Sequence, residues 1–106
     1  MHSLKTEIAL GYDINNLLCI WSEKGHLKCI KYLIMRGANN FNGGLREACM
    51  ARNKDLVELM ISLGANNYSL YYPCKGGSKE IVELIMSKDG HNRGLEGACI
   101  VGHIEL

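Results

Sequence analysis

The apolar residues of this chain follow two alternating patterns, and both patterns repeat. A short pattern with Leu at its first position and Cys at its fifth occurs at Leu45–Cys49, Leu70–Cys74 and Leu95–Cys99, at a spacing of 25 residues. A longer apolar pattern follows the first two, at Leu56–Ile61 and Ile81–Met86. Apolar residues at positions i, i+3 and i+4 share one face of a helix. The chain is therefore predicted to consist of repeated units of two helices each.

Turn residues separate the two helices of each unit and end the unit. Glycine and asparagine tolerate positive φ, and one of them stands in every predicted break: Gly25-His26, Arg52-Asn53, Gly77-Ser78 and Gly102-His103. The second helix is followed by Gly37-Ala38-Asn39-Asn40 and by Gly64-Ala65-Asn66-Asn67, as expected of a glycine stop signal. Pro73 falls inside the first helix of its unit. We expect that helix to start late or to be distorted, because proline lacks the N–H donor.

Repetition at this interval predicts an all-α solenoid of stacked antiparallel helix pairs that form a single domain over residues 1–106. Residues 1–17 make a degenerate half unit, in which Leu4 and Ile8 form a weak apolar stripe before Gly11. Full units follow at 18–44, 45–69 and 70–94, and a partial unit at 95–106. The first full unit aligns at a spacing of 27, with its two additional residues in the connection at 41–44.

Charge and length narrow the classes of function. The net charge is +1, with 12 basic and 11 acidic residues interspersed, whereas a nucleic-acid footprint requires a basic stripe. No segment has the apolar length of a secretory signal or a membrane-spanning helix. We therefore expect an intracellular, cytoplasmic protein that binds neither nucleic acid nor membrane. Its five cysteines are then expected to be reduced thiols: Cys19, Cys29, Cys49, Cys74 and Cys99.

Residues 48–66 resemble the helix pair of the ankyrin repeat, whose pattern runs Ala-Ala-x-x-Gly-His-x-x-x-Val-x-Leu-Leu-Leu-x-x-Gly-Ala-Asp/Asn. Gly25-His26 and Gly102-His103 match its turn between helices, and Gly37-Ala38-Asn39 matches its close. Ordinary ankyrin units run about 33 residues and carry Thr-Pro-Leu-His, which this chain lacks. It looks like the short-repeat ankyrin proteins of giant DNA viruses of amoebae. The resemblance implies a protein-binding scaffold whose first helices line a concave face and whose β-hairpins are shortened or absent.

The residue types that carry chemistry do not form a catalytic or metal-binding pattern. Cys49, Cys74 and Cys99 recur at equivalent positions but lack Cys-x-x-Cys pairs and interleaved histidines, so we interpret these three cysteines as small core residues. His26 and His103 stand in turns, where the imidazole can hydrogen-bond local backbone. The glutamates have no context that implies a raised pKa. We expect no enzyme activity, no cofactor and no metal.

Candidate partner-binding residues lie off the buried stripe of the first helices. They are Arg46, Glu47, Tyr71, Tyr72 and Glu96. Tyrosine is enriched at protein interfaces, and incidental exposure is the open alternative for the two tyrosines. Phe41, Tyr68 and Arg93 follow the unit ends at equivalent places. These three residues either fix the connections onto the stack or contact a partner.

The pattern as a whole favours non-catalytic recognition of an intracellular protein, which would be a host protein if the chain is viral. The alternative is a structural role. The partial unit carries Ile100, Ile104 and Leu106 without a polar cap, and solenoid ends need capping for solubility. The chain would then self-associate through its C-terminal end or form part of a longer array.

Overall fold

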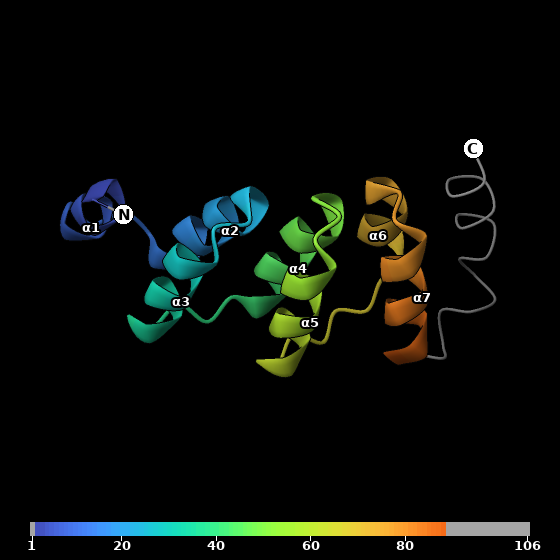
Figure 1. Ribbon diagram of the computed structural model, residues 1–106. Coiled ribbons are helices and arrows are strands. Elements are labelled where there is room, and N and C mark those ends of the chain that lie inside the picture. Colours follow the sequence, from blue (N-terminus) through green and yellow to red (C-terminus); the bar gives the residue numbers. More distant parts are fainter. Residues whose placement is uncertain (1, 89–106) are drawn as a thin grey trace.

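The computed structural model describes residues 2–88, with side chains from residue 4 onward. It contains seven helices and no strand within that range (Figure 1). Their bounds are α1 (His2–Ala9), α2 (Ile14–Lys24), α3 (Leu27–Met35), α4 (Phe41–Met50), α5 (Lys54–Ser62), α6 (Tyr71–Gly76) and α7 (Lys79–Lys88). The fold is therefore all-helical over the described residues, as the apolar pattern predicted.

After α1 the helices alternate between two layers (Figure 1). In the first layer α2 contacts α4 and α4 contacts α6, and each of these helices also packs on its successor, α3, α5 or α7. Grooves separate the helices of the second layer. One lies between α3 and α5, and another between α5 and α7. The first layer is thus the more closely packed of the two.

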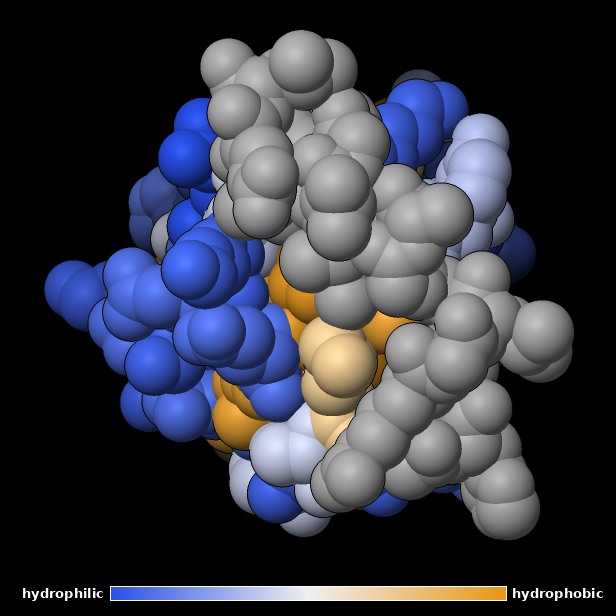
Figure 2. All heavy atoms as spheres, turned by 90° about the vertical axis from the view of Figure 1, so that its right-hand side faces the viewer, coloured by the Kyte–Doolittle hydropathy of each residue, from blue (hydrophilic) through white to orange (hydrophobic). Residues whose placement is uncertain are grey.

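The core is made of the apolar positions that recur in each unit. In α4 the buried residues include Leu45, Ala48 and Cys49. In α5 they are Leu56, Val57 and Met60, and in α7 Ile81, Val82 and Ile85. Seen from the α7 end (Figure 2), hydrophobic side chains of the described residues lie at the centre, and hydrophilic ones lie to the left of them. The predicted helical faces are confirmed by this burial.

Left-handed residues make the turn between the two helices of each pair. Gly25 has φ 70°, Arg52 φ 59° and Gly77 φ 82°. The prediction that asparagine supplies the positive φ at Arg52-Asn53 is wrong. Asn53 has φ −102° and caps α5 instead, because its side-chain oxygen accepts a hydrogen bond from the N–H of Leu56 at 3.1 Å.

The second helix of a pair ends in the predicted glycine stop. Gly37 has φ 108° and Gly64 φ 119°. The N–H of Ala38 donates to the carbonyl oxygen of Leu33 at 3.0 Å, and the N–H of Ala65 to that of Met60 at 2.9 Å. These bonds satisfy carbonyls that the helix end leaves unpaired, as in a Schellman motif. Both alanines are buried, so the stop also contributes to the core.

Helix α6 is only six residues long and begins at Tyr71. This confirms the late start predicted from Pro73. The proline occupies the third position of the helix, where its missing N–H would have no partner within the helix. Gly76 lets the short helix approach α4, since a Cβ at that position would overlap the backbone carbonyl oxygen of Cys49.

Two asparagine clamps join successive helix pairs. The side-chain oxygen of Asn42, in the first turn of α4, accepts hydrogen bonds from the N–H groups of Asn66 (2.8 Å) and Asn67 (2.9 Å). Its side-chain nitrogen donates to the side-chain oxygen of Asn66 at 3.1 Å. Asn15 of α2 makes the same three contacts with Asn39 and Asn40. Each clamp holds the chain as it leaves one pair for the next.

The cysteines differ in their surroundings. Cys29, Cys49 and Cys74 are buried, as expected of core residues, whereas Cys19 is half-buried. Cys74 is disulfide-bonded, so the expectation of a reduced thiol at that position is wrong. The predicted partial unit at 95–106, with its apolar residues, lies outside the described residues.

Candidate protein-binding surface

Four of the predicted binding residues lie together on one surface of the first layer. Arg46 and Glu47 stand between the buried Leu45 and Ala48 of α4, so the helical period turns them away from the core. Tyr71 and Tyr72 are the first two residues of α6, the next helix of that layer. We call this the α2–α4–α6 surface.

Arg46 is the centre of the surface because it contacts all three helices. Its Nε donates to the Glu47 carboxylate at 3.1 Å, and a terminal nitrogen lies 3.8 Å from the sulfur of Cys19 on α2. Its guanidinium carbon lies 6.0 Å from the centre of the Tyr72 ring on α6. Burial lowers the pKa of Arg46, but the hydrogen bond and charge of Glu47 outweigh that effect, and the pKa is raised. The guanidinium therefore stays charged and held in place.

The tyrosines extend the surface along α6. The two rings meet edge to face with centres 4.9 Å apart. Tyr71 is 58% exposed, whereas Tyr72 is half-buried and packs against the core. The ammonium group of Lys75 lies 5.6 Å from the centre of the Tyr71 ring. Cation–π contacts of this kind are worth about 0.5–1 kcal/mol at exposed sites, so they favour one arrangement of the rings.

A hollow of about 200 Å³ lies between α2 and α4. Its lining consists of Asn16, Cys19, Ile20, Glu23, Arg46 and Glu47. Burial raises the pKa of the Cys19 thiol, and the negative charges of Glu47 and Asp13 add to this, while Arg46 opposes it. The thiol is therefore protonated at neutral pH.

The residues that α2 contributes to this surface were missed by the sequence analysis. The sequence repeat could have identified two of them. The spacing of 27 that aligns Leu18 with Leu45 also aligns Cys19-Ile20 with Arg46-Glu47. The side chain of Ile20 is 39% exposed, so it can be reached by a partner at this surface.

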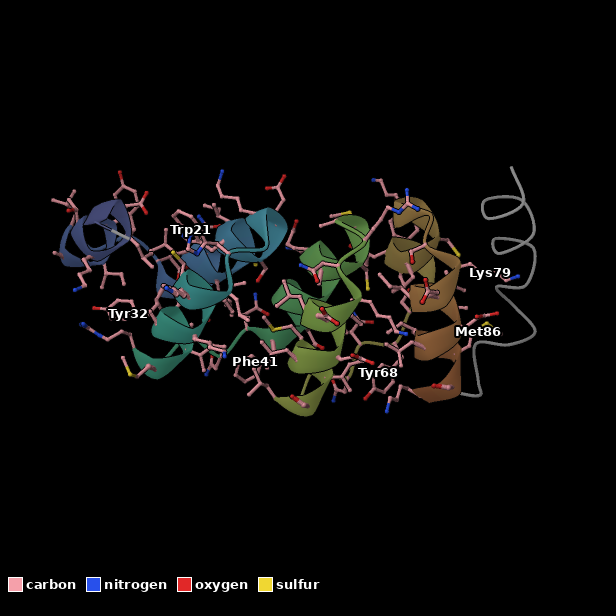
Figure 3. All side chains as sticks on the ribbon, in the orientation of Figure 1. Trp21, Tyr32, Phe41, Tyr68, Lys79 and Met86 are labelled. Carbon is pink, nitrogen blue, oxygen red and sulfur yellow. The ribbon has the colours of Figure 1, made fainter. Side chains whose placement is uncertain are left out.

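The secondary candidates lie elsewhere. Phe41 and Tyr68 stand at the opposite edge of the molecule from Trp21, near the connections between pairs (Figure 3). Both are partly buried and pack against the core, which favours a structural role over partner contact. The expectation of a connection at 41–44 is wrong, because Phe41 is the first residue of α4. Arg93 and Glu96 lie outside the described residues.

His26 does not play the predicted backbone-bonding role at the start of α3. Its side chain makes no capping hydrogen bond. The imidazole instead meets the Trp21 ring edge to face, with ring centres 5.6 Å apart. The exposed imidazole therefore packs on an aromatic neighbour of its own helix pair.

Between residues 2 and 88, no three His, Cys, Asp or Glu side chains are grouped so that they could hold a metal ion. None of the helices in that range is long and apolar enough to cross a membrane. Comparison with known proteins gave no match to any family model, curated protein or solved structure.

Proposed function

We propose that this chain is an ankyrin-like repeat protein of the short-repeat type, and that it recognises another intracellular protein without catalysis. The helix pairs α2–α3, α4–α5 and α6–α7 support the solenoid interpretation, because equivalent residues make equivalent turns. Gly25, Arg52 and Gly77 all adopt the left-handed conformation between paired helices. The two asparagine clamps add a second equivalent contact between successive pairs.

The observation that carries the functional proposal is the composition and continuity of the α2–α4–α6 surface. Arginine and tyrosine are the residue types that most often dominate binding energy at interfaces. Here Arg46, Tyr72 and Tyr71 contact one another in succession across two helices. Because their neighbours already hold them, little side-chain freedom remains to be lost when a partner binds. The surface is pre-organised for a protein partner.

The resemblance to viral short-repeat ankyrin proteins extends the proposal to the location of the partner. In that case the chain would act in the host cytoplasm on a host protein. The surface needs no cofactor for such a role, since recognition by a rigid stack depends on shape and side-chain choice.

The test is capture from a eukaryotic cell lysate followed by mass spectrometry. The variant Arg46→Glu/Tyr71→Ala/Tyr72→Ala removes the central contacts of the α2–α4–α6 surface. A matched control, Lys31→Glu/Glu58→Ala/Lys88→Ala, changes three exposed residues of the second layer. Circular dichroism must first show that both variants remain folded.

We expect wild type and the control to enrich the same specific protein and the surface variant to lose it. Equal capture by all three proteins would contradict the proposal, because the partner would then bind elsewhere. Capture of nothing above background by wild type would contradict the recognition function itself.

A further inference from the structure

We infer that the hollow between α2 and α4 receives an arginine or lysine side chain of the partner, an inference that rests on the proposed function. The hollow measures about 200 Å³, whereas pockets for drug-sized ligands measure about 300–1,000 Å³. It is part of the α2–α4–α6 surface, since Arg46 and Glu47 belong to both. Its size suits one side chain inserted from a larger partner.

The charge of the lining favours a cation. Two carboxylates, Glu23 and Glu47, and one guanidinium, Arg46, line the hollow. The Arg46 guanidinium already forms an ion pair with the Glu47 carboxylate at 3.1 Å, so these two opposite charges offset each other within the lining. Glu23 is exposed and makes no ion pair within the described part of the chain. A basic side chain would find an unpaired carboxylate at Glu23.

The apolar part of the lining suits the stem of the same side chain. Ile20 is 39% exposed and lies one turn before Glu23. Lysine and arginine place their methylene groups along apolar surface while the charged end reaches a polar partner. Cys19 continues the apolar lining, because its thiol is protonated. An acidic occupant would meet Glu23 and Glu47, and like charges in proximity repel.

The test is a titration of the ¹⁵N-labelled chain, followed by NMR, with three probes: N-acetyl-arginine amide, N-acetyl-norleucine amide and N-acetyl-glutamate amide. We expect saturable shifts at the amides of Ile20, Glu23 and Glu47 with the arginine probe only. Norleucine supplies the stem without the charge, and glutamate supplies the opposite charge. Equal affinity for either of these, or no saturable shift with the arginine probe, would overturn the inference.

Single substitutions test the proposed electrostatics. Glu23→Gln should lower the affinity for the arginine probe about two- to fivefold, which is the effect of removing one exposed charge pair. Glu47→Gln should lower this affinity further and allow the glutamate probe to bind, because Arg46 then lacks the carboxylate that forms its ion pair. Glu58→Gln, on α5 in the second layer, should change nothing. Unchanged affinity in Glu23→Gln would refute the assignment of the cation to this carboxylate.

The titration needs no natural partner, so it can fail independently of the proposed function. Capture of a specific protein without arginine binding would support the recognition function but refute the insertion of a basic side chain into the hollow. Capture of the partner by Glu23→Gln at the wild-type level would refute that insertion as well. Arginine binding without any captured protein would instead contradict the function on which the inference depends.

Discussion

Replacement of Asn42 by alanine should loosen the joint between the second and third helix pairs. The substitution removes one acceptor and one donor that together make three hydrogen bonds, with the N–H groups of Asn66 and Asn67 and with the Asn66 side chain. Alanine leaves α4 itself intact, because the cap of that helix comes from Asn40, which accepts from the N–H of Gly43. The effect should therefore report on the joint rather than on the helix.

The size of the effect follows from the exposure of these bonds. A net contribution of about 0.5–1.5 kcal/mol is typical for one intramolecular hydrogen bond. All three lie among exposed groups, where water replaces the lost partner, so each belongs at the lower end of that range. We expect a loss of about 1.5–2 kcal/mol in the free energy of unfolding. For a chain of this size that loss lowers the Tm by roughly 6–12 °C.

The assay combines urea denaturation with hydrogen exchange at the amides of Asn66 and Asn67. Asn42→Asp is the matched control, because it keeps the oxygen that accepts both N–H groups and replaces the donating amide nitrogen by a second carboxylate oxygen. It should lose less than half as much stability as alanine, and the two amides should stay protected. A change in stability below about 0.3 kcal/mol in Asn42→Ala, with unchanged exchange, would refute the clamp, since independent surface substitutions lie within about 0.5 kcal/mol.

Three further predictions concern the packing, the turn and the buried thiol. Gly76→Ala should lower the free energy of unfolding by about 1–3 kcal/mol, because the added Cβ overlaps the backbone of Cys49. Gly44→Ala is the control and should lose less stability in the same urea assay, because its Cβ meets only the Met60 side chain. Arg52→Gly should raise the free energy of unfolding by about 1 kcal/mol, because the left-handed conformation of Arg52 strains residues that have a Cβ. An unchanged urea midpoint would contradict this prediction. Burial raises the pKa of Cys49 to about 12 from 9.0, so above pH 9 only the unfolded chain ionises this thiol. The free energy of unfolding should then fall with rising pH more steeply in wild type than in Cys49→Ala.

The local features of the fold could be predicted because each depends on a few adjacent residues. Gly37 and Gly64 end helices through a backbone conformation that glycine favours, and the sequence shows both the glycine and the apolar stripe before it. The late start of α6 follows from Pro73 in the same way. The placement of Arg46 off the buried face of α4 follows from the helical period once Leu45 and Ala48 are assigned to the core.

Contacts between units could not be predicted, because they depend on how far one helix is rotated and displaced against the next. The pairing of Arg46 with Cys19 joins residues 27 positions apart, and no local pattern distinguishes it from other pairings. To predict the clamp by Asn42, one must know both that Asn42 lies in the first turn of α4 and where the connection after α5 runs. The turn at Arg52 was predicted one residue too late, since asparagine there suited both a left-handed turn and a helix cap.

The asparagine clamps have a consequence for how such a protein can change its length during evolution. Asn15 and Asn39 are 24 residues apart, as are Asn42 and Asn66. An in-frame deletion of residues 16–42 would therefore bring Asn15 to the same separation from Asn66, and a duplication of that segment would insert a further joint of the same kind. Recombination between copies can add or remove whole pairs without new hydrogen-bonding partners having to arise by point mutation.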